Sequence, residues 1–537
     1  MNEVASRALP EFTAIDSLGE ALARLDLRLS PVPGAGFGIA RLYRVDVAAW
    51  GLVARECRRL GFRWAGLWLD HLEHQAFCAY AAFEKQGCYV VVTTDLSPSA
   101  PSLPSHALYY PAADRVERHA SDLFGIPFVG HPDPRPWVRH QAWSDYQFPL
   151  RKEFPAAGSP SALTPPDSGY PFLASASPEV YEIPVGPVHA GIIEPGHFRF
   201  LAMGEAVLNL EERLGYVHKG IEKIAEGRDA SGLARLAGRV SGDSTVAHSW
   251  AACMAMEQAC GLAVPPRAVY LRAILLERER IANHLGDIGA ICNDVGFPFA
   301  NYQFTRLKEG WLRENLGCFG HRLLMDRVVP GGVVVELPPE NVEAMRHSLT
   351  ALDADLRELR PLLETNHSLQ DRLVNAGVLS LEAAESLGCL GYVGRASGFD
   401  SDLRRSWRNA PYDSVTLDSA TRQDGDVAAR LDVRYDEIHA SIELLRQLLD
   451  GMPSGDILAG WPNRVQVGEG LGLVEGWRGE VLAFVRFDQN GRVARYHPRD
   501  PSVFNWPALE RLIHGNIVPD FPLCNKSVNG SYAGHDL

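Results

Sequence analysis

The chain has 537 residues, which is too long for one ordinary hydrophobic core and predicts about three domains. Its content of 46% hydrophobic and 22% charged residues is typical of a soluble globular protein. A formal net charge of −14 argues against nucleic acid as a partner, because surfaces that bind nucleic acid are basic. No stretch approaches about eighteen uninterrupted apolar residues, so we expect no membrane-spanning segment of its own.

Nine cysteines are scattered along the chain, and no two of them have the CxxC spacing. That spacing is typical of compact zinc and iron–sulfur sites, so the sequence alone offers no such framework. The N-terminus lacks a basic segment followed by an apolar run, and no export signal is predicted. We therefore expect reduced, mostly buried thiols in the cytosol.

Residues 1–155 are predicted to form a small α/β domain. The run RLYRVDVAAWGLVARECRRLGFRWAGLWLD predicts a strand, a helix and a second strand, and AFCAYAAFEKQGCYVVVTTDL predicts a hairpin that turns at Gln86-Gly87. A helix follows in DRVERHASDLFGI, where apolar residues recur at helical spacing. The proline-rich stretch after it is predicted to lie extended over a surface.

Residues 156–178 are rich in Pro, Ser, Gly and Ala and are predicted to be a linker. The second domain, residues 179–537, is expected to begin with strands. A helical core is predicted over about 215–460, followed by antiparallel strands over about 465–500 with a tight turn at Asn490-Gly491. The predicted fold class is therefore α+β multidomain.

Motifs in both domains carry a family resemblance. The N-terminal domain ends in ERHASDLFGIPFVGHPDPRPW followed by FPLRKEFP, which is similar to the signature of the small soluble complex I subunit beside the quinone-site subunit. By composition alone this run predicts a surface clamp, with an internal loop that has no partner as the alternative.

Seven further motifs follow in the second domain: GPVHAGIIEPGHFRF, RLGYVHKGIEKIAEG, RVSGDSTVAHS, ERERIANHLGDIGAICNDVG, VVPGGV, GRASGFDSDLR and GEGLGLVEGWRGE. Their order resembles the large subunit shared by complex I and the membrane-bound energy-converting hydrogenases, such as formate hydrogenlyase. The resemblance implies a hydrogenase-large-subunit-like helical bundle flanked by small antiparallel sheets.

The sequence departs from this resemblance at the nickel site. In the hydrogenases of this family the turn before VAHS supplies two cysteines, whereas this chain has Ser241 and Ser244. The second cysteine pair lies near the C-terminus, where this chain has Cys524 and no sulfur three residues away. A serine hydroxyl is a harder and far less acidic ligand than a thiol. We therefore expect no nickel–iron centre and no metal ligands, with Cys524 as a structural thiol.

The resemblance also implies proton-handling residues. Glu194 looks like the proton-transfer glutamate beside nickel in hydrogenases, and the same loop of complex I carries a histidine that meets the quinone headgroup. His189 and His197 both lie nearby, so the choice between them stays open, and His189 bonding to backbone in a tight loop is the alternative. Asp294 matches a complex I aspartate that pairs with this histidine, with a plain turn residue as the alternative.

Lys219, Arg280 and His284 match positions that in complex I surround the terminal iron–sulfur cluster of the neighbouring small subunit. A cation near a cluster raises its reduction potential, and a histidine couples its charge to pH. The alternatives are a solvated lysine and a salt bridge between helices. The quinone-binding tyrosine of complex I would fall close to Gly242 or Asp243, where this chain has no tyrosine, which argues against ordinary quinone reduction.

The resemblance implies a peripheral redox subunit on the cytoplasmic side of the bacterial inner membrane. Its expected partners are a small iron–sulfur subunit, a ferredoxin-like subunit and ion-translocating membrane subunits. The iron–sulfur cluster would belong to the partner, and NAD binding is implied by the family alone, because no glycine-rich dinucleotide fingerprint follows a strand. Two classes stay open: an oxidoreductase that binds a quinone-type acceptor, and a non-catalytic scaffold or coupling subunit.

Overall fold

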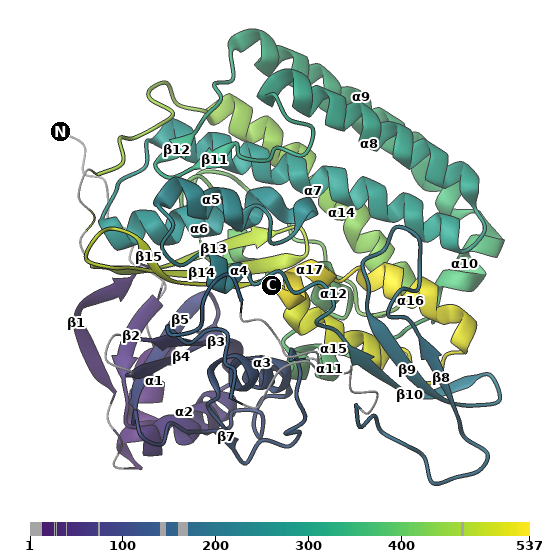
Figure 1. Ribbon diagram of the computed structural model, residues 1–537. Coiled ribbons are helices and arrows are strands. Elements are labelled where there is room, and N and C mark those ends of the chain that lie inside the picture. Colours follow the sequence, from purple (N-terminus) through teal and green to yellow (C-terminus); the bar gives the residue numbers. More distant parts are fainter. Residues whose placement is uncertain are drawn as a thin grey trace. The chain divides into compact units, whose positions relative to one another are not determined.

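The computed structural model describes residues 13–25, 27, 29–38, 40–72, 76–139, 146–158, 170–407, 409–462, 465 and 467–537. The chain divides into two compact units, Met1–Pro165 and Pro166–Leu537, each with its own sheets and helices (Figure 1). The predicted α+β multidomain fold is confirmed. Part of the predicted linker, residues 159–169, lies outside the described residues, as does most of the segment in which we looked for an export signal.

Unit 1 is built on a five-stranded sheet in the order β1-β2-β5-β4-β3. Only the pair β2 and β5 is parallel. The predicted strand, helix, strand and hairpin are confirmed, and Gln86 and Gly87 turn the hairpin with φ angles of 52° and 81°. The elements are α1 (Thr13–Ala23), β1 (Ser30–Phe37), β2 (Ala40–Arg44), α2 (Val47–Arg59), β3 (Arg63–His71), β4 (Phe77–Lys85), β5 (Cys88–Leu96), β6 (Leu103–Pro104), α3 (Asp114–Phe124) and β7 (Phe128–Val129).

The proline-rich run after α3 is largely irregular, as predicted, apart from the short pairing of β7 with β6. It is fastened to its own unit. Asp122 on α3 accepts the backbone N–H groups of Trp137, Val138 and Arg139 at 2.7, 2.7 and 3.1 Å. Arg118, one helical turn earlier, donates to the carbonyl oxygen of Arg135 at 2.9 Å. One carboxylate and one guanidinium of α3 therefore hold the run in place.

Unit 2 begins with an antiparallel sheet of β8 (Tyr181–Val185), β9 (His197–Met203) and β10 (Ala206–Arg213). Short helices α4 (Ile221–Ile224) and α5 (Ala230–Ala237) lead into the helical core. Its long helices are α6 (Thr245–Cys260), α7 (Pro266–Asp294), α8 (Pro298–Phe319), α9 (Pro339–Glu364) and α14 (Val427–Gly451). Between them lie β11 (Val328–Val329), β12 (Gly332–Val333), α10 (His367–Leu373), α11 (Leu381–Leu387), α12 (Gly391–Ala396) and α13 (Leu403–Ser406).

The C-terminal part of unit 2 forms a second antiparallel sheet, β13 (Glu469–Gly476), β14 (Gly479–Phe487) and β15 (Val493–Arg499), with the predicted turn at Asn490-Gly491. Three helices follow that were not predicted from the sequence: α15 (Ser502–Leu512), α16 (Phe521–Val528) and α17 (Tyr532–Asp536). In Figure 1 these yellow helices lie beside α12, far from it in sequence. Their docking is what completes the site described below.

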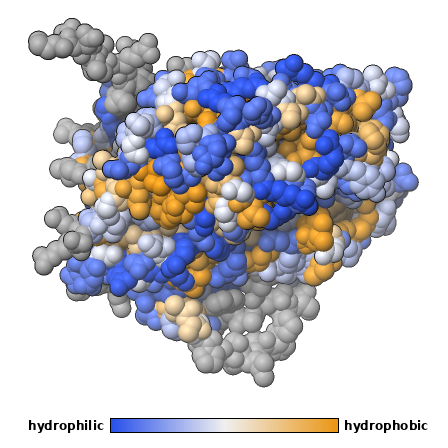
Figure 2. Space-filling view, turned by 90° about the horizontal axis from the view of Figure 1, so that it is seen from above, coloured by the Kyte–Doolittle hydropathy of each residue, from blue (hydrophilic) through white to orange (hydrophobic). Residues whose placement is uncertain are grey.

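Helix α7 is buried over most of its circumference, as its apolar pattern predicted. It packs against α8 and α14, and its apolar residues belong to one large core with those of α6, α9 and α14. No helix in the described part of the chain combines the length and the apolar character that crossing a bilayer requires. Hydrophobic side chains that reach the surface form separate patches among hydrophilic ones on the face shown in Figure 2.

A glycine stripe joins the C-terminal sheet to α6. Gly468, Gly470 and Gly472 alternate along one strand, so all three face the same side. A Cβ atom on any of them would overlap a carbonyl oxygen of α6, from Ala259, Ala255 and Ala251 respectively. Because glycine has no side chain, the strand lies directly on the backbone of the helix, and this contact holds the start of α6 near the β13–β14 turn.

We predict that Gly472→Ala destabilises the chain by about 1–3 kcal/mol, because the added methyl group meets backbone that cannot rotate away. The measurement is denaturant unfolding of the full chain. Gly310→Ala is the matched control: Gly310 lies on α8 with open space around its Cβ position. That change should stabilise the helix by about 1 kcal/mol or less. Equal effects of the two substitutions would contradict the close contact.

Candidate functional site

The turn before α6 meets the C-terminal segment. Ser241 donates its hydroxyl hydrogen to Asp243 Oδ1 at 2.7 Å, and its Oγ lies 2.8 Å from Oγ of Ser531. Since Ser241 has only one hydroxyl hydrogen, the hydroxyl of Ser531 is the donor in the second bond. Ser241, Ser244 and Ser531 are all buried. Two segments almost three hundred residues apart in sequence are therefore joined through a pair of hydroxyl groups.

Ser531 and Gly534 have the same three-residue spacing as Ser241 and Ser244. The Ser531 hydroxyl accepts the backbone N–H of Gly534 at 2.9 Å, which caps the short helix α17. A Cβ atom on Gly534 would lie 2.6 Å from Oδ2 of Asp500 and 3.0 Å from Oγ of Ser531. Any side chain at position 534 would therefore displace the Asp500 carboxylate.

An ion pair lies beside the hydroxyls. Arg478, in the β13–β14 turn, binds both carboxylate oxygens of Asp243 at 2.7 Å, and its Nη1 lies 3.3 Å from Oγ of Ser244. Burial would raise the pKa of Asp243, but the Arg478 guanidinium brings this pKa below its ordinary value. Trp477 next to it donates its indole N–H to the carbonyl oxygen of Asp243 at 2.9 Å. The site thus contains a fixed positive charge close to the serine hydroxyls.

A second buried pair joins α6 to the end of the C-terminal sheet. His248 Nε2 lies 2.8 Å from Oδ2 of Asp500, and both residues are fully buried. Burial would raise the pKa of Asp500, but the bond with His248 brings this pKa down to about 2. Glu279 on α7 accepts the backbone N–H groups of Val246 and Ala247, so a carboxyl group also binds the N-terminal turn of α6. Burial raises the pKa of Glu279 to about 8. These contacts fix the position of the turn.

Three of the residues predicted from sequence lie around these two segments. Lys219 donates from Nζ to the carbonyl oxygens of Arg239 and Val240 at 2.7 and 2.8 Å, directly before Ser241. Burial lowers the pKa of Lys219, although Glu194 and nearby aspartates oppose that shift. Oε2 of Glu194 accepts the backbone N–H of Ala533 at 3.0 Å.

His189 reaches the C-terminal segment from the loop between β8 and β9. Its Nε2 lies 3.2 Å from the hydroxyl oxygen of Tyr532, and its Nδ1 lies 3.2 Å from the carbonyl oxygen of Pro187. The backbone contact expected as an alternative is therefore present together with a side-chain contact. His197 lies apart from this pair: it is buried at the start of β9 and accepts a long bond from Arg199 at 3.4 Å.

Arg280 and His284 lie deeper in unit 2, and both are fully buried. His284 Nε2 lies 2.8 Å from Oε2 of Glu437, and Arg280 binds Glu277 and two backbone carbonyl oxygens. The salt bridge between helices that was the alternative interpretation is thus present. The ring of His284 meets the ring of Trp477 edge-on at 5.8 Å, so this layer lies directly behind the serine turn. Their proximity to a partner's cluster stays a prediction.

The side chains of Asp294 and Cys524 make their contacts away from the serines. Asp294 is ten residues beyond His284 on α7, about 15 Å along the helix, and its closest cation is Lys526 at 4.0 Å. Burial raises the pKa of Asp294 despite that lysine. Cys524 is buried beside Gly377, and burial raises the pKa of its thiol to about 12, so it stays protonated.

Comparison with known proteins gives matches along both units. Residues 46–160 match the family described as respiratory-chain NADH dehydrogenase 30 Kd subunit, and residues 294–465 match its 49 Kd subunit. Residues 219–286 match nickel-dependent hydrogenase. The chain is 31% identical to formate hydrogenlyase subunit 5 of Escherichia coli K12, over 84% of this chain and 79% of that protein. The chain belongs to the family of complex I-type and hydrogenase large subunits with a fused 30 kDa-type domain.

Two further similarities fit this family. The fused C/D-type component of the NADH-quinone oxidoreductase of Phocaeicola vulgatus is 32% identical over 74% of this chain and 79% of that protein. Among solved structures, a chain of the membrane-bound sulfane sulfur reductase, an archaeal respiratory membrane complex, is similar with a TM-score of 0.64 and 26% identity. That match covers 68% of this chain and all of the other. The resemblance given on motifs is thereby confirmed.

In this chain, unlike the hydrogenases of the family, the residues at the turn supply hydroxyl and backbone amide groups instead of sulfur. Ser241, Ser244 and Ser531 offer three hydroxyls, and Gly534 offers no side chain. A thiolate-bound nickel–iron pair does not fit these donors or the Asp500 carboxylate packed on Gly534. Among the residues that the structure describes, no group of three or more His, Cys, Asp or Glu side chains is arranged to hold a metal ion.

Several residues of the site were not singled out from the sequence. Ser531 and Gly534 were overlooked because Cys524 was the only sulfur near the C-terminus, although their spacing repeats that of the serine turn. The other overlooked residues are Asp243, His248, Arg478, Asp500 and Tyr532. His248 and Arg478 lay inside quoted motifs, but pairing between residues about 250 positions apart leaves no local signal.

We predict that the double variant S241C/S531C forms an intramolecular disulfide under mild oxidation, because the two Oγ atoms are 2.8 Å apart. The measurement is mass spectrometry of a proteolytic digest without reduction. The single variant S241C, which retains Cys524, is the control and should form no crosslink between positions 241 and 524. A 241–524 disulfide in the control would mean that Cys524, and not Ser531, faces the turn.

Proposed function

We propose that this chain is a peripheral redox-linked subunit of a membrane-bound oxidoreductase of the complex I and energy-converting hydrogenase type. It would lie on the cytoplasmic side of the membrane and contact a small iron–sulfur subunit, a ferredoxin-like subunit and ion-translocating membrane subunits. Electrons would arrive at the partner's cluster and not at a metal held by this chain. Similarity to subunits of membrane respiratory and hydrogenase complexes supports the assembly.

The single observation that carries this proposal is the contact between the turn before α6 and the C-terminal segment. Where a hydrogenase would present thiolates, this chain has a Ser241–Ser531 hydrogen bond, and the Arg478 guanidinium lies 3.3 Å from Ser244. The Asp243 carboxylate is already bound by Arg478 through both oxygens, and neutral hydroxyls are poor ligands for nickel. The site therefore does not need an ion to be complete, and we infer that the chain contains no nickel–iron centre.

The region around Lys219, Glu194 and His189 is where we expect an acceptor to be reduced. His189 is half-buried and bonded to Tyr532, and Glu194 reaches the same segment. An imidazole, a phenol and a carboxylate together can supply protons to a reduced acceptor. The chain has no tyrosine near position 243, where the resemblance to complex I would place one. Tyr532 supplies a phenol group beside His189 instead.

Two acceptor classes have support. A quinone-type acceptor follows from similarity to NADH-quinone oxidoreductase subunits. A sulfane sulfur compound is the second candidate, because the similar solved structure belongs to a sulfane sulfur reductase. The alternative function is a non-catalytic scaffold or coupling subunit, and the completeness of the hydrogen-bonded serine site without any ligand favours it.

The first prediction concerns metal content. The complex purified through a tag on this chain should contain iron and acid-labile sulfide from its partner but no stoichiometric nickel, and it should evolve no hydrogen. Elemental analysis and a hydrogen assay measure this, with a nickel–iron hydrogenase prepared in parallel as the positive control. One nickel per chain, or hydrogen evolution, would overturn the proposal.

The second prediction concerns the acceptor site. His189→Asn should lower acceptor turnover by the complex about tenfold or more, since removal of a proton-transferring group has effects of this order. His347→Asn, which replaces an exposed histidine of α9, is the matched control and should retain turnover. The assay uses a soluble quinone analogue and, separately, polysulfide. Turnover of neither acceptor by the unmodified complex would favour the scaffold function.

A further inference from the structure

A cluster of charged side chains lies in the interior of unit 2, behind the serine site. Seven of its eight members lie on α7, α12, α13, α14 and β13, and the eighth lies directly before α13. None of them is more than 4% exposed. They are Glu277, Arg280, His284, Arg395, Asp402, Arg404, Glu437 and Glu475. Neither the family resemblance nor the proposed function assigns a role to the cluster as a whole.

The charges of this cluster do not balance. It contains four carboxylates, three guanidiniums and the imidazole of His284, and among the described residues it adjoins the hydroxyl of Tyr412, 3.3 Å from Oε1 of Glu277. An uncompensated buried charge is costly in free energy, so groups in such a position take up or release a proton instead. Within the described residues, one proton makes the cluster neutral.

Three of the carboxylates are well compensated. Glu437 binds Arg395 at 2.6 Å and His284 at 2.8 Å, with Arg280 at 3.6 Å. Asp402 binds Arg404 through both oxygens at 3.0 and 2.6 Å.

Glu277 accepts hydrogen bonds from Arg404 at 2.9 Å, from Arg280 at 3.1 Å and from the Ser441 hydroxyl at 2.7 Å. These three acids therefore stay ionised while their partners stay charged.

Glu475 is the least compensated of the four acids. Among the described residues, its Oε1 has one cation, Arg395 at 3.2 Å, and that guanidinium is shared with Glu437 and lies 3.7 Å from Asp402. In the same part of the chain, its Oε2 accepts only the backbone N–H of Leu403 at 3.2 Å. Arg280 meets Glu475 through the backbone carbonyl oxygen and not through the carboxylate. Burial lowers the pKa of His284, the other group that could carry the missing proton, so this proton belongs on Glu475.

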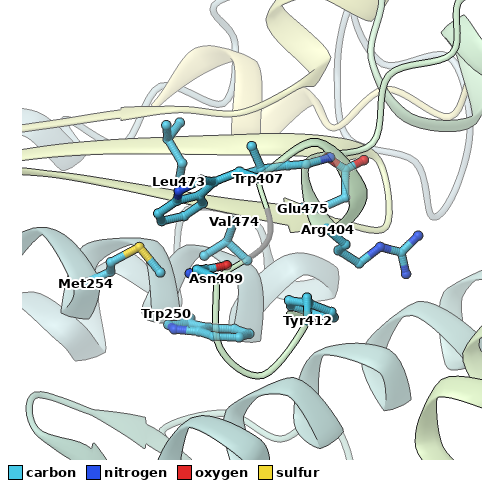
Figure 3. Close-up of a pocket in the computed structure, with 10 residues that line it drawn as sticks. Trp250, Met254, Arg404, Trp407, Asn409, Tyr412, Leu473, Val474 and Glu475 are labelled. Atoms are coloured by element: carbon cyan, nitrogen blue, oxygen red, sulfur yellow. The ribbon is translucent and has the colours of Figure 1, made fainter. Parts of the chain in front are cut away.

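The cluster reaches a pocket between α6, β13 and the segment after α13 (Figure 3). Arg404 and Glu475 belong to both the cluster and the pocket wall. In Figure 3, Trp250 of α6 lies opposite Trp407 with Asn409 between them. Trp407 and Asn409 are half-buried, so this pocket connects the edge of the cluster with the surface.

We propose that Glu475 is a proton-exchange site: it holds the one mobile proton of the buried cluster and exchanges it with solvent through this pocket. Burial, followed by the negative charge of Asp402, raises the pKa of Glu475 to about 7, in agreement with the geometry. The other charged groups that face it are Arg395, Arg280 and Arg404. The wall formed by α6 contributes Trp250 and Met254, which have no charge.

Glu475 lies three residues before Arg478, whose guanidinium is beside Ser244, so the two sites share the end of β13 and its turn. In the proposed function, Glu475 would take up a proton when negative charge arrives at a neighbouring electron carrier. The inference does not depend on that role. Its test uses the full chain alone, so its failure and the failure of the proposed function are distinguishable.

The first test is infrared titration of the full chain. Burial raises the pKa of Glu117 and of Glu279 to about 8, so these two acids also contribute protonated-acid bands near neutral pH. The expected result for Glu475 is a component of this absorption that is present at about pH 6 and disappears as the pH rises through about 7. The variant Glu475→Gln should lack this component, and Glu343→Gln, which removes an exposed glutamate of α9, should retain it. No component that titrates near pH 7 in the unmodified chain, or one that survives in E475Q, would overturn the proposal.

The second test is unfolding of E475Q and the unmodified chain across pH. If the pKa of a carboxyl rises from its ordinary 4.5 to about 7 on folding, the folded chain loses stability as the pH rises between these values. E475Q, which cannot ionise, should therefore gain in relative Tm between about pH 4.5 and about pH 7, and the gap should stay constant above.

Glu343→Gln, which removes the exposed glutamate of α9, is also the control for this test. Because this side chain is exposed and lies outside the cluster, E343Q should not show the gain in relative Tm between about pH 4.5 and about pH 7 that E475Q shows. A pH-independent difference between E475Q and the unmodified chain, or the same trend in both variants, would contradict a mobile proton on Glu475.

Discussion

The contact on which unit 2 depends is the one between the turn before α6 and the last helix of the chain. The hydroxyls of Ser241 and Ser531 meet there, and Arg478 binds Asp243 beside them. Each group satisfies part of the hydrogen-bonding capacity of another, and the three serines and Arg478 are buried. The loop with Glu194 and His189 then has a fixed surface to bind, because both residues contact the docked C-terminal segment.

The chemistry available in unit 2 follows from this arrangement. Sulfur and a metal ion can accept and donate electrons, whereas hydroxyls, carboxylates and guanidiniums can only hold charge and exchange protons. The unit concentrates such groups in two adjoining layers, the serine site and the cluster around Glu437 and Glu475. Trp477 contacts both layers, through its indole N–H and through its ring. Proton exchange is therefore the chemistry that these side chains support.

Local patterns predicted the regular elements well where a helix or strand has one buried face. The buried stripe of α7, the hairpin at Gln86-Gly87 and the C-terminal strands are examples. Prediction failed for α15 to α17, because short helices with prolines, such as Pro507 inside α15, lack a clear apolar period. Because this C-terminal region was not predicted, Ser531 and Gly534 were not recognised as site residues. Asp294 was grouped with Glu194 and His189 by resemblance, and its own contacts are with Lys526.

The sequence by itself determined the family, the main elements up to the C-terminal strands and the replacement of the cysteines of the serine turn, because each depends on a local run of residues. Only the tertiary structure decided which residues share a site. Ser241 with Ser531, His248 with Asp500 and Arg395 with Glu475 are pairs formed by packing between distant segments. The imbalance of buried charge exists only after folding, because water and ions compensate the same side chains in the unfolded chain.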